Sequence, residues 1–476
     1  MQPQWSEQLT KEGVFMKKEE FRIEKDGLGE VCIPKDALYG IHSKRASENF
    51  PITHTNLDTD FISAIAQVKK AAAQANRESG NLTPEKADAI ILACNAIISG
   101  KYHNAFIVDP LQGGAGTSSN MNANEVIANI ALLHLGKKPG DYHFIHPIDH
   151  VNMHQSTNDV IPTAGRLTVI KKAMHLISSL RTLTASLDQK AAEFDNILCV
   201  GRTQLQDAVP MKAGQTFSAF SSMLKRSIAQ IERAIDLMRT VNLGGTAIGN
   251  GINATKYYFD NVVARLSEVT NEKLYRFANL FDGTQNADDF ASVSSAVKIC
   301  AVKLSKMASD LRLLSSGPNS GMGQVILPAR QSGSSIMPAK INPVLPEALN
   351  QAAFLTIGHD LTISVAVEAG QLELNAFLPV VFHQLFEELT ILDNAVATFT
   401  ENCIRDIKIN EAQCNLDVGR CYSTATALNP VLGYDTSTEI VKKAQKTGKS
   451  IVDIACEDYG LTRDRLKELL DPLNLV

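Results

Sequence analysis

The chain has 476 residues, which is more than one simple core usually holds, so we expect two to four domains or a core shared between subunits. The apolar fraction of 44% and the charged fraction of 20% are ordinary for a folded protein, and the aromatic fraction of only 6% leaves small aliphatic side chains to fill the core. The formal net charge is -5 and Lys and Arg form no block, so the sequence lacks the positive footprint that a nucleic acid requires.

Cysteine usage and the N-terminal segment predict a cytoplasmic protein with no membrane partner. The eight cysteines include no CxxC pair and most lie in apolar runs, which indicates reduced, buried thiols. The first 20 residues are polar and contain no signal-peptide core, and no run reaches the ~18 apolar residues that a membrane span needs. We expect residues 1–20 to be a loose extension, with either Met1 or Met16 as the native start.

The N-terminal part of the chain predicts short elements followed by helices. Prolines and glycines punctuate the first 60 residues, which favours turns and short strands. A helical pattern begins at Phe61, is interrupted by a cluster of glycines between residues 113 and 116, and resumes over Asn122–Leu135. Gly140 and Pro147 mark a second break.

The middle of the chain predicts long helices with a coiled-coil-like seam. Apolar residues recur every three or four positions in two stretches, which is the spacing of one helix face. Such helices are about 35–45 Å long at 1.5 Å per residue, and one small core can hardly bury their apolar sides. We therefore expect a bundle formed by several identical chains, although an intrachain coiled hairpin explains the same spacing. The two seams are Phe217, Phe220, Leu224, Ile228, Ile231, Ile235 and Met238, and Val297, Cys300, Leu304, Met307, Leu311 and Leu314.

Residues 315–346 are rich in glycine and proline, which predicts a long loop between helices. After Asn410 the pattern shortens into small helices. The expected fold is mainly α, a three-domain subunit whose central bundle of long helices assembles into a multi-subunit helical core. The expected domains are a mixed N-terminal domain (1–157), a long-helix domain (158–412) with an active-site loop (317–346), and a small helical C-terminal domain (413–476).

Two polar segments precede helices in the first half of the chain. In Gly114–Glu125, glycines are followed by hydroxyl and amide side chains, which suits a cradle for a carboxylate or phosphate and equally suits simple N-capping. Gln155–Asp159 supplies neutral donors, with the same two interpretations. His146, His150 and His154 lie just before it, but no cysteine or paired carboxylate completes a metal-ligand set, so we expect no metal site.

Two further polar segments follow. Gly201–Asp207 is a weak signal by itself, because a polar turn between helices has the same composition. Gly333–Val344 is more specific: its prolines exclude a regular helix, so two serines, a lysine and an asparagine lie on a shaped loop. Three large apolar residues within this segment make a generic surface loop a poor explanation.

Taken together, the four segments resemble the aspartase/fumarase superfamily. The pattern GSSxMPxKxNP over Gly333–Pro343 is similar to that superfamily's hallmark loop, and the patterns GTSxNMNxNEV, QSTND and GRTxLQDA follow its other active-site regions in the same order. The resemblance runs from about Phe21 to the C-terminus.

Within the superfamily, the sequence is most similar to the enzymes that deaminate aspartate. Tyr39–His42 and Asn342–Glu347 resemble the aspartase forms, whereas fumarases have Trp-Gly-Ala-Gln and NPTQ there. The implied reaction is reversible deamination of L-aspartate to fumarate and ammonia by anti β-elimination through an aci-carboxylate. A class II-type fumarase and an amine lyase acting on a substituted aspartate are the alternatives, and a non-catalytic structural protein on the same fold is a remote one. Ile148 and His154 depart from the usual form of the second region.

The resemblance also implies roles for single residues. Ser334 would be the general base, with its alkoxide stabilised by loop N–H groups and Lys340. Gln204 occupies a position where fumarases and some aspartases carry His and other aspartases carry Gln. The resemblance implies a homotetramer whose active sites each combine three subunits, with no cofactor, and it leaves open activation by Mg²⁺. The expected substrate-binding residues are Thr117, Ser118, Ser156, Thr157, Asn158, Thr203, Gln204, Ser335, Lys340 and Asn342.

Overall fold

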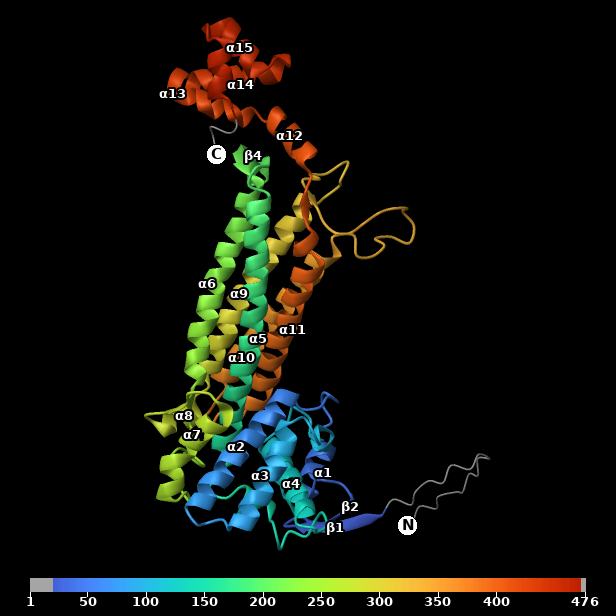
Figure 1. Cartoon of the computed structure of the whole chain (residues 1–476), viewed down its shortest axis with the longest axis vertical. Helices are drawn as coiled ribbons and strands as arrows, with labels where there is room; N and C mark the ends of the chain where they lie inside the picture. Colours follow the sequence, from blue (N-terminus) through green and yellow to red (C-terminus); the bar gives the residue numbers. More distant parts are fainter. Residues whose placement is uncertain (1–19, 472–476) are drawn as a thin grey trace, which may run out of the picture. The chain divides into compact units, whose positions relative to one another are not determined.

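A computed structural model describes residues 20–471 as a largely helical chain (Figure 1). It divides into two compact units: the chain up to Ala164 together with Asn242–Thr284, and Gly165–Val241 together with Gln285 onward. The predominance of helix confirms the expected fold class. The predicted domain boundaries near residues 157 and 412 stay predictions, and most of the predicted N-terminal extension lies outside the described residues.

The first unit contains a β-hairpin and a set of helices. Asp58 caps helix α2 by accepting from the N–H groups of Asp60 and Phe61, and Pro84 opens α3, where a missing N–H costs nothing. The hairpin pairs β1 (Phe21–Asp26) antiparallel to β2 (Gly29–Pro34). The helices are α1 (Ile41–Asn49), α2 (Thr59–Glu78), α3 (Pro84–Ile98), α4 (Thr117–His134), the start of α5 (Thr157–Glu193), α7 (Lys256–Thr270) and α8 (Leu280–Gln285), with short turns at His103–Ala105 and Pro147–Val151 and a two-residue strand β6 (Tyr275–Arg276).

The second unit is built on long helices that run side by side (Figure 1). Every residue of the predicted seam in α6 is buried, and so is every residue of the seam in α9 up to Leu311, which confirms both helical predictions. Gly165 permits a close approach, since a Cβ there would lie 2.5 Å from the ring of Phe382 in α11. The bundle helices are α5, α6 (Ala213–Met238), α9 (Asp288–Leu314), α10 (Val344–Glu368) and α11 (Leu378–Asn402).

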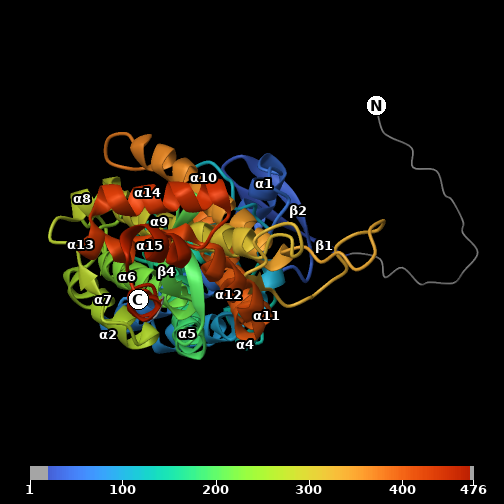
Figure 2. The same cartoon turned by 90° about the horizontal axis from the view of Figure 1, so that it is seen from above.

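Small elements complete the second unit. Strands β3 (Leu198–Thr203) and β4 (Gln206–Lys212) form an antiparallel hairpin, and β7 (Val325–Ile326) pairs with β8 (Lys408–Ile409). The C-terminal helices bury a core of their own around Leu428, Ile440 and Leu466, and α14 lies beside α15 in both views (Figure 2). The remaining elements are β5 (Thr240–Val241), turns at Ile404–Asp406 and Tyr422–Leu428, α12 (Glu411–Arg420), α13 (Asn429–Leu432), α14 (Tyr434–Thr447), α15 (Ile451–Tyr459) and α16 (Arg463–Leu469).

Between residues 20 and 471, none of the helices combines the length and the apolar character that crossing a bilayer requires.

A buried polar network joins three helices of the bundle. Ser294 of α9 donates to Asp360 of α10 (3.0 Å) and to Glu388 of α11 (3.4 Å), and Lys298 forms an ion pair with Asp360 (2.6 Å). Glu388 is fully buried, and burial raises the pKa of its carboxyl well above the usual value, with the charge of Asp360 acting in the same direction. Burial therefore favours the protonated form of Glu388 in the folded state.

Glu388→Gln should flatten the pH dependence of stability. The folded state keeps a proton that the unfolded chain loses, so the contribution of Glu388 is fully present below the unfolded pKa of 4.5 and declines as pH rises, at up to about 1.4 kcal/mol per pH unit. Gln cannot ionise and removes this slope. Urea unfolding at pH 5 to 8 measures it, with Glu401→Gln on the exposed end of the same helix as the control. Parallel wild-type and Glu388→Gln profiles would show that Glu388 is ionised in the fold.

Candidate active site

The N-termini of α4 and α5 converge in the first unit. The side-chain amide of Asn120, in the first turn of α4, donates to Thr157 Oγ1 at the start of α5 (3.2 Å). Gly116 precedes α4 with φ +93°, and a Cβ there would lie 2.8 Å from Ile161 of α5. This left-handed glycine starts α4 at Thr117, five residues earlier than the Asn122 start that the sequence predicted.

A buried carboxylate fixes the turn before α5. Asp159 Oδ1 accepts from the N–H of Ser156 (2.9 Å), and Oδ2 accepts from those of Gly244 (3.0 Å) and Thr246 (3.1 Å). Burial raises the pKa of Asp159 to about 6, and the three N–H donors act against that rise. The carboxylate therefore fixes the backbone of Ser156 and of the adjacent Thr157.

Lys69 lies in the same interior. Its Nζ donates to Asn152 Oδ1 (2.8 Å), which also accepts from the amides of Asn120 (3.1 Å) and Asn124 (3.2 Å). Burial lowers the pKa of Lys69 to about 7, and the charge of Asp159 opposes that shift. Since Asn120 also contacts Thr157, this amide cluster links the buried lysine to the helix start.

The predicted binding residues of the first unit occupy these two helix starts. Thr117 is exposed, and Ser118, Ser156, Thr157 and Asn158 are half-buried, so each can reach a ligand. The Asn158 amide donates to the carbonyl of Ala247 (2.7 Å), which sets the orientation of its side chain. The helix dipole favours an anion at such a position, and hydroxyl side chains add donors without adding charge.

The motif near Tyr39 is anchored to the same helix α4. Glu125 accepts from the N–H groups of Gly40 (2.8 Å), His42 (2.8 Å) and Ser43 (3.1 Å) at the start of α1. Burial raises the pKa of Glu125, and these hydrogen bonds oppose the rise. Two separate sequence motifs thus meet at one carboxylate.

The three histidines are not on one regular helix. His146 caps the short turn at Pro147–Val151, His150 Nε2 lies 2.8 Å from Lys86 Nζ, and His154 Nδ1 lies 2.6 Å from Asn76 Oδ1. Over residues 20–471, no cluster of three His, Cys, Asp or Glu residues has the geometry of a metal site.

In the second unit, Thr203 and Gln204 lie at the tip of the β3–β4 hairpin. Gln204 (φ +53°) and Leu205 (φ +65°) form a two-residue turn with both φ values positive, which matches the right-handed twist of the strands. Both predicted side chains are exposed at this tip.

Ser334 lies in the loop between β7 and α10. Its Oγ accepts from the N–H groups of Met337 (2.9 Å) and Ile336 (3.2 Å). The loop is closed at its base, because Gly333 N–H donates to the carbonyl of Lys340 (2.9 Å) and the amide of Asn342 donates to the carbonyl of Gly333 (2.7 Å). Ser335 and Lys340 are exposed on the same loop. A serine oxygen that faces two N–H donors can carry negative charge.

Residues 29–358 match a family model described as Lyase. The chain belongs to this lyase family. Residues 425–476 also match a model described as Fumarase C C-terminus. Aspartate ammonia-lyases of a Bacillus species and of Helicobacter pylori J99 are each 46% identical to it, over 95% and 96% of this chain and 97% and 98% of theirs.

Solved structures agree with the lyase family. A cobalt-bound fumarate lyase:delta crystallin of Brucella melitensis superposes with a TM-score of 0.93 at 46% identity, covering 96% of this chain and 99% of that one. A class II fumarase of Schistosoma mansoni gives 0.92 at 32% identity, with the same coverage. The predicted superfamily is confirmed by these matches.

The lyase-family motifs fall into both units of the chain. The first unit carries Thr117, Ser118, Ser156, Thr157 and Asn158, and the second carries Thr203, Gln204, Ser334, Ser335, Lys340 and Asn342. The hydrogen bond from Asn120 to Thr157 and the close packing of Gly116 against Ile161 join the two helix starts that carry the first set. The sequence did not reveal Lys69, Asn120 or Asn152 as supports, although a lysine inside an alanine-rich helix is a signal that could have identified the first.

Asp159→Ala should lower the free energy of unfolding by about 3–5 kcal/mol, because it leaves three buried N–H groups without an acceptor and removes the charge opposite Lys69. Chemical unfolding measures the loss. Asp149→Ala is the control, since that side chain is 75% exposed and should change stability by less than about 0.5 kcal/mol. Equal effects of the two variants would contradict the anchoring role of Asp159.

Proposed function

We propose that the chain is an aspartate ammonia-lyase, which converts L-aspartate reversibly to fumarate and ammonia. Curated relatives that carry this name share 46% identity over 95–96% of the chain. The motifs Tyr39–His42 and Asn342–Glu347 have the aspartase form, and Glu125 and Gly333 hold them in the fold.

The observation that carries the proposal is the environment of Ser334. A serine hydroxyl is a weak base unless its alkoxide is stabilised, and two backbone N–H groups already face Ser334 Oγ at 2.9 and 3.2 Å. Lys340 on the same loop adds a positive charge. Ser334 therefore removes the Cβ proton of the substrate in this proposal.

The chemistry explains the polar, acid-poor set of binding residues. Loss of the Cβ proton places two negative charges on the adjacent carboxylate, which needs fixed donors around it. Thr117, Ser156, Thr157 and Ser335 supply hydroxyl groups for it, while Thr203, Lys340 and Asn342 bind the other carboxylate. Ser118 is a further substrate-binding residue in this proposal. Asn158 and Gln204 face the ammonium.

The leaving group needs no separate acid and the reaction needs no cofactor in this scheme. The ammonium departs already protonated, and the proton taken by Ser334 is returned to water. Activation by Mg²⁺ stays a prediction of the family resemblance. Eight free cysteines, six of them buried, favour a reducing compartment and hence the proposed cytoplasmic location.

The length of α5 favours sites shared between subunits. Thr157 begins this 37-residue helix, which is about 55 Å long. Nine residues lie between its last residue, Glu193, and Thr203, so the ten Cα-to-Cα steps span at most about 36 Å when extended. The nine-residue connection is too short to lead back along the whole of α5, so Thr203 cannot reach Thr157 of its own chain. Because both threonines are proposed ligands of one substrate, they must come from different chains.

An exposed apolar face on α10 supports the proposed homotetramer. Phe354, Leu361 and Val365 recur on one side of this helix and are 60%, 66% and 60% exposed. A stripe of this kind in a bundle helix is the usual form of a subunit interface. Association of long helices from four chains would bury it.

Absorbance of fumarate provides the test of function. The purified protein should produce fumarate from L-aspartate and consume it when ammonium is added, with no comparable rate from malate. Production of fumarate from malate instead would favour the fumarase alternative. The observation behind that alternative is the similarity of the chain to the Schistosoma mansoni class II fumarase. Ser334→Ala should lower kcat by at least about 10³-fold, because the base and its stabilised oxygen are lost.

Ser332→Ala is the matched control for that variant. Ser332 is an exposed serine two residues away whose hydroxyl donates a long hydrogen bond to the Ser334 carbonyl (3.4 Å), so its loss should leave turnover unchanged. Near-normal turnover by Ser334→Ala would remove Ser334 from the role of base.

Hybrid oligomers test the shared site. Ser334→Ala and Thr157→Val should each be inactive, and co-expression of the two should restore about one quarter of the sites by random assembly. No recovery in confirmed mixed oligomers would place both residues of a site on one chain.

A further inference from the structure

A polar triad joins three segments of the second unit that are far apart in sequence. Arg202 donates to Gln324 Oε1 (2.9 Å) and to Asp417 Oδ2 (3.4 Å), and the Gln324 amide donates to the same carboxylate oxygen (2.7 Å). Gln324 is 4% exposed, and the side chains of Arg202 and Asp417 are 17% and 19% exposed. Each member contacts the other two.

Arg202 belongs to the hairpin that presents proposed substrate ligands. It is the penultimate residue of β3, directly before Thr203 and the turn residue Gln204. Side chains alternate along a strand, so Arg202 points away from the face of Thr203. Its hydrogen bonds to Gln324 and Asp417 therefore fix strand β3 from the side opposite Thr203.

Gln324 anchors the first part of the loop that carries Ser334. Its N–H donates to the carbonyl of Leu314 at the end of α9 (2.9 Å), and its carbonyl accepts from Asn410 before α12 (2.8 Å). It directly precedes β7, ten residues before Ser334. Its position decides where the loop leaves the bundle.

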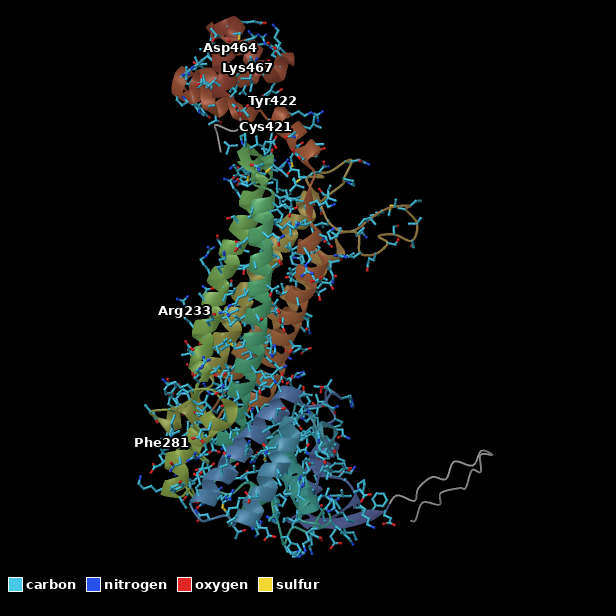
Figure 3. All side chains as sticks on the ribbon, viewed as in Figure 1. Arg233, Phe281, Cys421, Tyr422, Asp464 and Lys467 are labelled. Atoms are coloured by element: carbon cyan, nitrogen blue, oxygen red, sulfur yellow. The ribbon has the colours of Figure 1, made fainter. Side chains whose placement is uncertain are left out.

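Asp417 supplies the carboxylate from α12, the first helix of the C-terminal part. Its second oxygen accepts from Gln413 on the same helix (2.8 Å), so both oxygens are occupied. Cys421 and Tyr422 follow where α12 leads into the small C-terminal helices (Figure 3). The triad is thus a polar link between these helices and the two active-site segments, alongside the longer hydrogen bonds from Cys421 and Ser423 to the carbonyls of Ala208 (3.5 Å) and Asp207 (3.4 Å).

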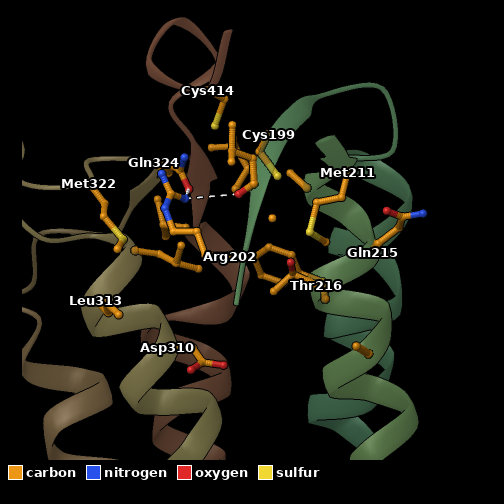
Figure 4. A pocket seen from close by; sticks show the side chains of 18 of the residues that line it. Cys199, Arg202, Met211, Gln215, Thr216, Asp310, Leu313, Met322, Gln324 and Cys414 are labelled. Carbon is orange, nitrogen blue, oxygen red and sulfur yellow. Dashed lines mark hydrogen bonds between the residues drawn. The ribbon is translucent and has the colours of Figure 1, made fainter. Parts of the chain in front are cut away.

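A small apolar cluster lies at this junction. The local core consists of Val200, Val418 and Cys421, with Leu198 at its edge. A cavity of about 370 Å³ lies beside it, and Arg202 and Gln324 line its wall next to each other (Figure 4). The directional polar contacts of the triad act together with this apolar cluster in fixing how the three segments meet.

We propose that Asp417 is a positioning residue for catalysis: through Arg202 and Gln324 it sets the placement of Thr203 and of the Ser334 loop from the C-terminal part of the chain. This inference rests on the proposed function for its catalytic consequence. The positional link itself does not depend on which substrate the protein uses.

The test combines kinetics with hydrogen–deuterium exchange on the full-length protein. Asp417→Asn keeps the size of the side chain and an acceptor for Gln324 but loses the charge opposite Arg202. With aspartate, KM should rise and kcat should fall, together lowering kcat/KM by about 10- to 100-fold. Arg202→Gln should have a similar effect, and the double variant should add little, because the residues act as a unit.

Exchange should become faster in both 198–204 and 325–343 of Asp417→Asn. The control, Asp458→Asn, removes an exposed ion pair with Lys443 within the C-terminal helices and should match the wild type in both assays. Lower kcat with unchanged KM and unchanged exchange would indicate simple loss of folded protein and overturn the proposal. A wild type that makes no fumarate, with faster exchange in the variant, would refute the proposed function and leave the positional link intact.

Discussion

The structure depends on backbone N–H groups that donate to fixed oxygens in its polar segments. In the loop, the N–H groups of Ile336 and Met337 donate to Ser334 Oγ. At the start of α4, those of Thr117 and Ser119 donate to the Gly114 carbonyl and to Gln112 Oε1. An N–H group is a strong donor only when the backbone that carries it is held still. The rest of the fold can be understood as the means of holding these short segments rigid.

Buried carboxylates hold the first unit in this way. Asp159 uses three N–H groups to order the turn before α5, and Glu125 uses three others to order the start of α1. Burial raises the pKa of both acids, and the hydrogen bonds counteract that rise. Burying these carboxyl groups therefore disfavours their ionised form, while their hydrogen bonds fix the backbone of the two helix starts. Because Asp159 and Glu125 are both buried, their negative charge is kept away from the exposed side of the proposed ligand site.

Periodicity predicted the bundle because burial repeats along a helix. The seams through Leu224 in α6 and Leu304 in α9 are buried as expected, since a residue every three or four positions must face the same neighbour. The start of α4 was predicted too late, because Gly116 adopts a left-handed conformation that composition alone does not specify. The motif residues were found because loop segments rich in glycine and hydroxyl groups stand out against apolar helices.

The supports behind those motifs could not be predicted by the same route. Arg202 reaches Gln324 across 122 residues, and Gln324 reaches Asp417 across 93, so no local pattern relates them. Lys69 and Asn152 are 83 residues apart and meet only through the packing of α2 against the turn before α5. Sequence patterns identify the residues that a site uses, whereas the residues that position them are brought there by tertiary contacts.

The loop that carries Ser334 is anchored before the serine and closed on itself around it. Gln324 holds the chain where it enters, and Asn342 closes it onto Gly333 where it leaves. Between these points Ile336 and Met337 are exposed, while their N–H groups stay directed at Ser334. The serine and its two stabilising donors therefore belong to one closed turn, so the geometry around Ser334 Oγ is set locally and does not depend on contacts with distant elements.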